Sequence, residues 1–293
     1  MARYHELRLY RSKLEDIREI MHSMKTLAQM ESHRLTRHIQ QQHAIADHIQ
    51  QVANDFLHFF PASLPSTESL NKTVLLIGSE RGFCGDFNGE VLRCYEADFS
   101  TEENVQLIAV GHKMTSLVEK QHAVTALQGA NVTEEISTLV EEVIHHLATQ
   151  KEVASLYAVY QSDLTGEPVV ETLLPAFTDL ETANTTLRHP PDLNLPPQDF
   201  LLELTDHALH HALHRLFYSS LMAENQRRIH HLENATQHLD QKTEHLQRRM
   251  NVLRQEAIIE EIEVILLNQA NLNSPEHPFG ETDNGFVNND ANH

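Results

Sequence analysis

Residues 75 to 88, LLIGSERGFCGDFN, hold the residue types most able to do chemistry in this chain. A short apolar run ends in a loop with glycines at Gly78, Gly82 and Gly85, and a helical pattern follows. A strand, a glycine-rich turn and a helix form the setting of a phosphate-binding loop. The glycine spacing differs from GxGxxG, however, and no Gly-Lys-Ser or Gly-Lys-Thr follows to reach a phosphate. The sequence therefore argues against phosphate binding here.

The same loop contains Cys84, a second candidate for chemistry. Nearby Arg81 would favour a thiolate, but no histidine or second cysteine flanks Cys84 to act as a base or a resolving thiol. Cys84 and Cys94 form no CxxC pair, which is typical of a reducing compartment. We expect both cysteines to fill small spaces in a core.

Histidines are the third candidate, because the chain has 22 of them. Four lie at helical spacings that could place two imidazoles on one metal ion: His207, His210, His211 and His214. No HExxH, cysteine ligand or Glu-x-x-His pair on facing helices accompanies them, and no GxSxG marks a serine nucleophile. We therefore expect solvated histidines, no metal, no cofactor, no catalytic residue and no enzymatic activity of the chain's own.

Composition limits the classes of partner. The chain has 293 residues, of which 40% are hydrophobic and 22% charged, so it is long enough for one or two folded domains. Its net charge of −20 disfavours nucleic-acid binding, which needs a basic surface. No run of 18 apolar residues and no apolar leader is present. We expect a cytosolic protein that reaches a membrane only through a partner.

Both ends of the chain predict long helices. No glycine or proline occurs before Pro61, and none occurs from Gln198 to Ser274. Apolar residues recur in each segment with alternating spacings of three and four, as in a coiled coil, and their seam positions include Leu14, Leu246, Met250, Val264 and Leu267. A helix as long as the second one would reach on the order of 100 Å at 1.5 Å per residue. We predict an antiparallel coiled coil, with helices at residues 1–60 and 200–270, in which polar breaks such as Glu31, His38 and Gln42 fix the register or face solvent.

Between these helices the pattern is of α/β type. Short β-type runs at 73–77, 106–110, 153–160 and 169–174 alternate with helical stretches near 89–98, 112–121 and 132–150. This alternation predicts a small Rossmann-like α/β domain at 70–178 with parallel strand pairs. Residues 179–199, rich in proline, read as a linker, and the acidic tail at 271–293 as disordered.

Four segments of this sequence resemble the γ subunit of F-type ATP synthases over nearly the whole chain to about Gln269. SERGFCGDFN is similar to the family's S/T-D-R-G-L-C-G-G-x-N. The residues that match the family's motif are Arg81, Gly82, Cys84, Gly85 and Asn88. IMHSMKTLA (20–28), NAT (234–236) and MNVLRQEAIIEEIEVI (250–265) resemble the family's I-T-K-A-M-x-M-V-A, N-A-T and Y-N-x-x-R-Q-A-x-I-T-x-E-I-x-E-I. The resemblance implies that the glycine loop is a structural turn of the central domain.

The function implied by this resemblance is mechanical. The chain would be the rotor shaft between the membrane c-ring and a ring of three α and three β subunits, with the ε subunit gripping its lower part. It would be peripheral, at the cytoplasmic face of a bacterial inner membrane, in a proton- or sodium-translocating complex. The positions implied to contact the ring are Met24, Lys25, Arg254, Gln255 and Glu261.

Several positions depart from the family pattern and indicate a divergent branch with retuned ring contacts. Glu19 and His22 replace lysines, Ile259 replaces a threonine and Asp86 replaces a glycine. Two other classes stay open at this point. A free-standing coiled-coil scaffold would need only the heptads, and an α/β enzyme with helical arms would bind a nucleotide by itself.

Overall fold

The computed structural model describes residues 2–61, 72–100, 102, 105–119, 124–150, 155–178 and 189–272. Its contacts divide the chain into two units. The core unit comprises Ile17–Leu239, and the end unit comprises Met1–Asp16 with Asp240–His293. Two long helices, α1 (Ala2–Phe59) and α5 (Pro197–Leu272), contribute to both units. Each unit is described below by itself.

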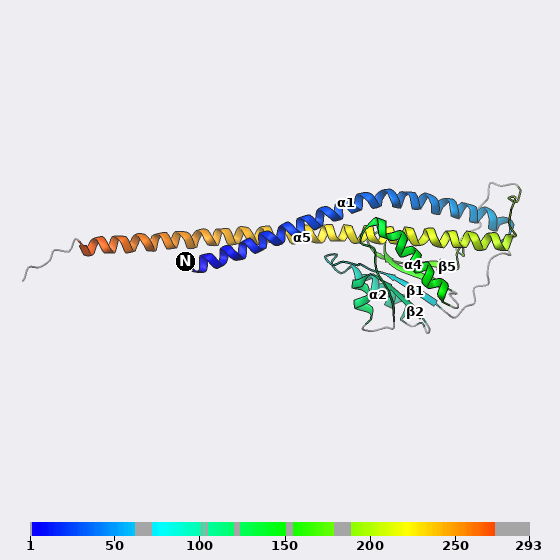
Figure 1. Ribbon diagram of the computed structural model, residues 1–293, viewed down its shortest axis with the longest axis horizontal. Coiled ribbons are helices and arrows are strands. Elements are labelled where there is room, and N and C mark those ends of the chain that lie inside the picture. The colour runs from blue at the N-terminus through cyan, green and yellow to red at the C-terminus, as the bar shows by residue number, and fades with distance from the viewer. Residues whose placement is uncertain are drawn as a thin grey trace, which may run out of the picture. The chain divides into compact units, whose positions relative to one another are not determined.

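In the core unit, α1 and α5 lie side by side in opposite directions (Figure 1). The Lys25 Nζ atom is 2.9 Å from Glu233, and the rings of His38 and Tyr218 stack at 5.3 Å. Near the end of α1, Phe56 packs against Phe200 at 4.8 Å. Residues later in α1 therefore contact residues earlier in α5, and the predicted antiparallel pairing is confirmed.

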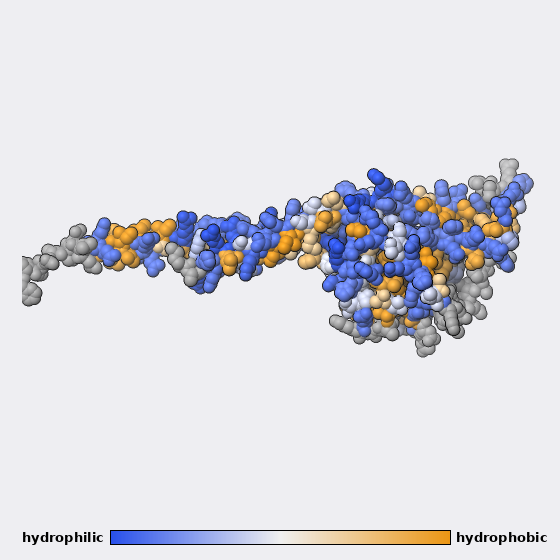
Figure 2. All heavy atoms as spheres, in the orientation of Figure 1, coloured by the Kyte–Doolittle hydropathy of each residue, from blue (hydrophilic) through white to orange (hydrophobic). Residues whose placement is uncertain are grey.

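The end unit repeats this pairing. The Lys242 ammonium lies 5.5 Å from the centre of the Tyr10 ring, a cation–π contact, and Arg11 donates a hydrogen bond to Gln247. Leu14, Leu246 and Met250 are buried, as their stripe positions predicted. Beyond these pairs α5 exposes a series of apolar side chains, seen as orange spheres in Figure 2: Ile258, Ile259, Ile262, Val264, Ile265, Leu266 and Leu267. The predicted seam positions Val264 and Leu267 are thus exposed in this unit.

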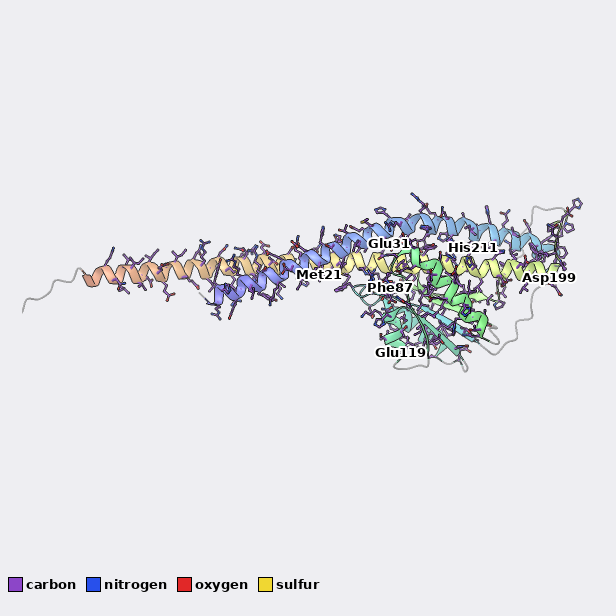
Figure 3. All side chains as sticks on the ribbon, in the orientation of Figure 1. Met21, Glu31, Phe87, Glu119, Asp199 and His211 are labelled. Atoms are coloured by element: carbon purple, nitrogen blue, oxygen red, sulfur yellow. The ribbon has the colours of Figure 1, made fainter. Side chains whose placement is uncertain are left out.

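The polar breaks of the α1 stripe make specific contacts. Glu31 is 8% exposed and accepts hydrogen bonds from the backbone and hydroxyl of Thr133. His38 stacks on Tyr218, and the Gln42 carbonyl is 3.2 Å from a ring nitrogen of His211. Figure 3 marks Glu31 on α1 and His211 on α5. Of the two alternatives predicted for these residues, a fixed register or exposure to solvent, the contacts favour the first.

A five-stranded sheet forms the middle of the core unit, in the order β3-β2-β1-β4-β5. The pairs β1·β2, β1·β4 and β2·β3 are parallel, whereas β4·β5 is antiparallel. The predicted parallel α/β sheet is confirmed, and one short strand, β3, was missed. The strands are β1 (Lys72–Ile77), β2 (Val105–Val110), β3 (Val124–Leu127), β4 (Ser155–Gln161) and β5 (Pro168–Leu174).

Helices cover both faces of this sheet, because alternate strand residues point to opposite sides. On one face, Val74 and Leu76 pack with α2 (Phe87–Phe99) and α3 (His112–Val118). On the other face, Leu75 and Ile77 pack with α4 (Ile136–Thr149) and with buried residues of α1 and α5. The two long helices are therefore part of the core of the α/β domain.

The boundaries of the helices differ slightly from the prediction. Helix α5 begins at Pro197, inside the segment predicted as linker, because proline suits the first turn of a helix, where its missing N–H has no partner to lose. The helix continues to Leu272, into the segment predicted as tail. The rest of that tail, 273–293, and the linker residues 179–188 lie outside the described residues. In the described part of the chain, no helix is both long and apolar enough to span a bilayer.

Candidate functional site

The loop after β1 is closed by its own side chains. Asn88, in the first turn of α2, accepts a hydrogen bond from the backbone N–H of Ser79 and donates one to the Ser79 hydroxyl, both at 2.8 Å. A Cβ on Gly78 would lie 2.4 Å from the Cβ of Met114, so only glycine fits between the loop and α3. Gly85, at φ +66°, lies in the left-handed region that glycine favours.

Glu80 ties this loop to the carboxyl ends of β2 and β3. Its Oε2 atom accepts the backbone N–H of His112 at 2.9 Å and that of Gly129 at 2.8 Å. The Ser79 N–H is already bonded to Asn88. These three N–H groups therefore have protein acceptors, and they could bind a phosphate only by giving those acceptors up.

Cys84 is packed into the same loop. Its side chain is 4% exposed and contacts Phe87 and Ala223, and its Sγ atom is 3.4 Å from the Ser79 hydroxyl. Burial raises the pKa of the Cys84 thiol and outweighs the opposing effects of its hydrogen bond with Ser79 and of the nearby Arg228. A thiol in this environment is poorly suited to be a nucleophile.

We therefore expect Cys84 to react slowly with iodoacetamide. At neutral pH the folded chain should be alkylated at Cys84 at least about tenfold more slowly than the urea-unfolded chain, because the sulfur is both buried and protonated. A Cys94→Ser background isolates the signal, which intact-mass spectrometry can follow. Equal rates in the folded and unfolded chains would contradict this assignment.

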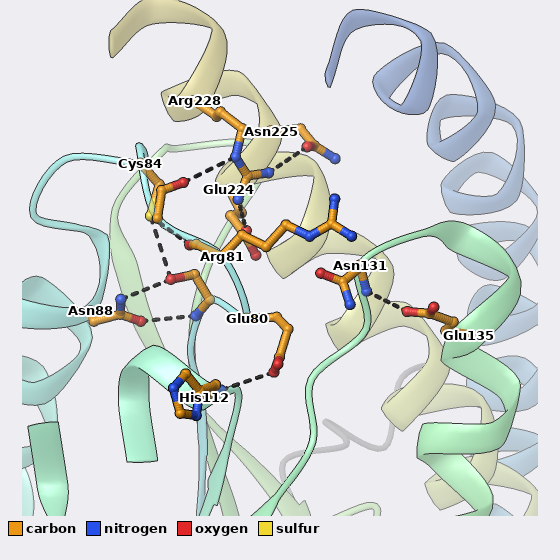
Figure 4. A network of polar contacts seen from close by, with 12 residues as sticks. Glu80, Arg81, Cys84, Asn88, His112, Asn131, Glu135, Glu224, Asn225 and Arg228 are labelled. Atoms are coloured by element: carbon orange, nitrogen blue, oxygen red, sulfur yellow. Dashed lines mark hydrogen bonds and ion pairs between the residues drawn. The ribbon is translucent and has the colours of Figure 1, made fainter. Parts of the chain in front are cut away.

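A buried charge network on α5 holds the loop from the other side (Figure 4). The Arg228 guanidinium donates to the carbonyl of Gly82 at 3.3 Å, to Asn225 Oδ1 at 2.9 Å and to Glu224. Glu224, Asn225 and Arg228 are 4%, 3% and 7% exposed. One arginine thus joins α5 to the glycine loop through contacts that are shielded from water.

Glu224 is the most perturbed carboxyl group of this network. Its burial raises the pKa to about 7, against the opposing effect of the paired Arg228 guanidinium. The nearby Glu80 carboxylate adds to the rise. Glu224 therefore takes up a proton more readily than an ordinary glutamate.

Of the five loop residues predicted from sequence, Gly82 accepts a hydrogen bond from Arg228 of this network, whereas Cys84 and Asn88 both contact the Ser79 hydroxyl within the loop. The Arg81 side chain instead extends toward α1 (Figure 4). The role of this loop as a structural turn remains a prediction, which these contacts support. Sequence reasoning missed Glu80, Glu224 and Arg228. The available signal was the Glu-x-x-x-Arg spacing of residues 224 and 228 on an otherwise apolar helix face.

The residues predicted to contact a ring are spread over both units. In the core unit, Met24 is half-buried and lines a cavity, and Lys25 is paired with Glu233. In the end unit, Arg254, Gln255 and Glu261 are exposed on α5. Their role as ring contacts remains a prediction.

The four clustered histidines lie on one part of α5. The rings of His210 and His214 are 4.5 Å apart, and burial lowers the pKa of His210 and His211. Among the residues that the structure describes, no group of three or more histidine, cysteine, aspartate or glutamate side chains is arranged to hold a metal ion.

Comparison with known proteins gives concordant matches. The family model described as ATP synthase matches residues 4–268. An ATP synthase gamma chain of Bdellovibrio bacteriovorus is 24% identical over 294 residues, covering 90% of this chain and 97% of that protein. Its counterpart from Clostridium novyi is 26% identical over 206 residues, covering 67% and 70%.

Solved structures share the fold. A chain of the Euglena gracilis mitochondrial ATP synthase, in a structure of OSCP, F1 and c-ring, has a TM-score of 0.64 at 16% identity and covers 98% of this chain and 99% of its own. A chain of the rotor of the same synthase has a TM-score of 0.59 at 16% identity, covering 88% and 99%. At this identity the structural likeness establishes the fold alone.

Proposed function

This chain belongs to the ATP synthase family and is its gamma subunit, the non-catalytic rotor of rotary ATP synthesis, and from this we propose that its two long helices and its central domain turn together and carry torque. The observation that carries the proposal is the match over residues 4–268, which includes both long helices and the α/β domain. The alternative of a free-standing scaffold is not favoured by this match. Its partners would be the α, β and ε subunits and the c-ring.

In this proposal the shaft acts by presenting a different face to each catalytic subunit as it turns. A contact that is stronger with one conformation of a subunit shifts that subunit toward the favoured conformation. Nucleotide is bound and turned over by the α and β subunits. This chain supplies the asymmetric surface, to which Met24, Lys25, Arg254, Gln255 and Glu261 would contribute.

Torque can pass between α5 and the central domain only if the two do not slip. The contacts of the core unit supply that rigidity. Arg227 donates to Glu90 at 2.8 Å and to the carbonyl of Gly166 at 2.7 Å, and the Ser219 hydroxyl donates to Asp163 at 2.5 Å. Together with Arg228 at the glycine loop, these bonds join α5 to several points of the domain.

Helix α1 is fastened to the same domain by Glu31. Its carboxylate accepts from Thr133 at the start of η2 (Thr133–Glu135), and the Arg34 guanidinium lies 3.3 Å from Glu134. A turn of α1 against the domain would break the hydrogen bonds from Thr133 to the buried Glu31 carboxylate, which is costly. The three parts of the core unit are therefore expected to rotate as one body.

We propose further that the complex lies at the cytoplasmic face of a bacterial inner membrane and translocates protons or sodium ions. The chain itself would be peripheral there, held through the c-ring. The test of the rotor role is co-expression with the α and β subunits of the same genome. Co-elution as three α, three β and one copy of this chain, with ATPase turnover that depends on it, is the expected result. Separate elution with unchanged turnover would contradict it.

Replacing the exposed α5 residues tests the proposed ring contacts. Arg254→Ala and Gln255→Ala should each lower ATPase turnover of the assembled complex about fivefold or more, because truncating a key residue near the centre of an interface costs more than about 1 kcal/mol. Both side chains are exposed, so the folding of the free chain should not change. Glu256→Ala, an exposed neighbour, is the matched control. If all three variants turn over ATP alike, these positions are not ring contacts.

A further inference from the structure

A cavity of 240 Å³ lies in the core unit, between α1, α5 and the segment before η2. The residues that matter for its chemistry are Arg81, Asn131, Asn225, Arg34, Glu31 and Glu224. Met24, Ala28 and Val132 form an apolar part of its wall. The rotor function described above uses Met24 of this wall as a ring contact but assigns no ligand to the cavity.

Asn225 leaves a hydrogen-bond donor unused at this cavity. Its Oδ1 atom accepts from Arg228, which can only donate, so the orientation of the amide is fixed. The Nδ2 group is consequently held on the other side, buried and without a hydrogen-bond partner in the structure. Because Asn225 is 3% exposed, water cannot freely satisfy this donor, and a buried donor without a partner is costly.

Asn131 leaves the opposite kind of atom unused. Its Oδ1 is buried and has no hydrogen-bond partner, while its backbone N–H donates to Glu135 at 2.6 Å. The Arg81 guanidinium extends into the space between α5 and Asn131 (Figure 4), and it makes no hydrogen bond within the described residues. The cavity therefore offers a neutral donor, a cationic donor and an acceptor.

Charge favours an anion in this cavity. Three arginines, Arg34, Arg81 and Arg228, line it against two carboxylates, Glu31 and Glu224. Both carboxylates are occupied by protein donors, Glu31 by Thr133 and Glu224 by Arg228. The guanidinium of Arg81, an exposed residue, is left to attract an anion.

From these atoms we propose that the cavity binds a small oxyanion that carries a hydroxyl group, of which inorganic phosphate is the representative. Its oxygens would accept from Arg81 and from Asn225 Nδ2, and its hydroxyl would donate to Asn131 Oδ1. The bound anion would join the glycine loop, α5 and the segment before η2. It would thereby stiffen the part of the core unit that holds the loop.

Sulfate is a close test of this chemistry, because it has the shape of phosphate but no hydroxyl at neutral pH. We would titrate the purified full-length chain with phosphate and with sulfate at matched ionic strength, using isothermal titration calorimetry and ³¹P NMR. We expect one saturable phosphate site and at least about tenfold weaker sulfate binding, since sulfate would place an oxygen lone pair against the Asn131 Oδ1 acceptor in place of a hydrogen bond.

Variants assign the site to these residues. Arg81→Ala and Asn225→Asp should each weaken phosphate binding at least about tenfold, and the aspartate keeps the acceptor for Arg228 while replacing the donor. Asn131→Ala should bind phosphate no better than sulfate. Arg248→Ala, which removes an exposed positive charge elsewhere, should bind like the parent chain. Circular dichroism checks that each variant is folded.

Absence of saturable phosphate binding, equal binding of sulfate, or unchanged binding by folded Arg81→Ala and Asn225→Asp would overturn the proposal. The titration uses the chain alone and has no ATPase readout. Its failure is therefore distinguishable from failure of the rotor role.

Discussion

Replacing Arg228 with alanine is expected to lower the free energy of unfolding by about 3–5 kcal/mol, because it leaves the Glu224 carboxylate buried without its counter-ion. The loss should be smaller near pH 5 than near pH 8. Glu224 already has a raised pKa in the folded chain, and removal of Arg228 raises it further, so a lower pH supplies the proton that relieves the buried charge. Urea unfolding followed by circular dichroism measures both effects.

The chain contains a matched control for this variant. Arg248 and Glu244 form the same i,i+4 pair on α5, but their side chains are 75% and 65% exposed. Arg248→Ala should therefore change the free energy of unfolding by less than about 0.5 kcal/mol. The double variant Glu224→Leu, Arg228→Met, which removes both charges, should be more stable than Arg228→Ala. Equal losses in Arg228→Ala and Arg248→Ala would show that the buried pair has no special role.

Gly111→Ala is expected to destabilise the core unit by more than about 3 kcal/mol or to prevent folding. Gly111 has φ +99°, and an added Cβ would lie 2.7 Å from the carbonyl oxygen of Gly78 and 2.8 Å from that of Ser79. Both obstacles are backbone atoms of the loop that Glu80 and Asn88 hold in place, so they cannot move aside cheaply.

Gly166→Ala measures the cost of a left-handed alanine backbone without the steric clash that Gly111→Ala adds. Gly166 also has a positive φ, +69°, but no heavy atom lies within 4 Å of the added Cβ. This variant should cost only the strain of a left-handed alanine, about 1–2 kcal/mol. Thermal and urea unfolding of the two variants provide the comparison. A Gly111→Ala variant as stable as Gly166→Ala would mean that the loop is not held as tightly as described.

The parts of the fold that were predictable from sequence are those with a long or regular pattern. The alternation of three and four along α1 and α5 predicted both helices and their antiparallel pairing, which stacking of His38 on Tyr218 confirms. Strands β1 and β2 were predicted because each is a continuous apolar run. Strand β3 was missed because VTAL has four residues, too few to give a periodicity.

The site was less predictable, because its contacts join residues far apart in the chain. Cys84, Gly82 and Asn88 were identified through the glycine loop, but the sequence gives no sign that the Gly82 carbonyl meets Arg228. Glu31 was identified as a polar break in an apolar stripe, and a polar residue at such a position indicates a buried polar contact. Its partner Thr133 lies in a segment with no such signal.

Direct observation of rotation is the closest test of the proposal that this chain is the rotor shaft. Glu119, exposed at the end of α3 (Figure 3), is a position for a single reactive cysteine in a Cys94→Ser background, because Cys84 is buried. A bead or gold particle attached at Glu119→Cys would be followed while an immobilised α3β3 ring hydrolyses ATP. The rotor role predicts unidirectional rotation that stops when ATP is withdrawn. The rotor role would be contradicted by a particle that does not rotate although its complex hydrolyses ATP and that hydrolysis depends on this chain.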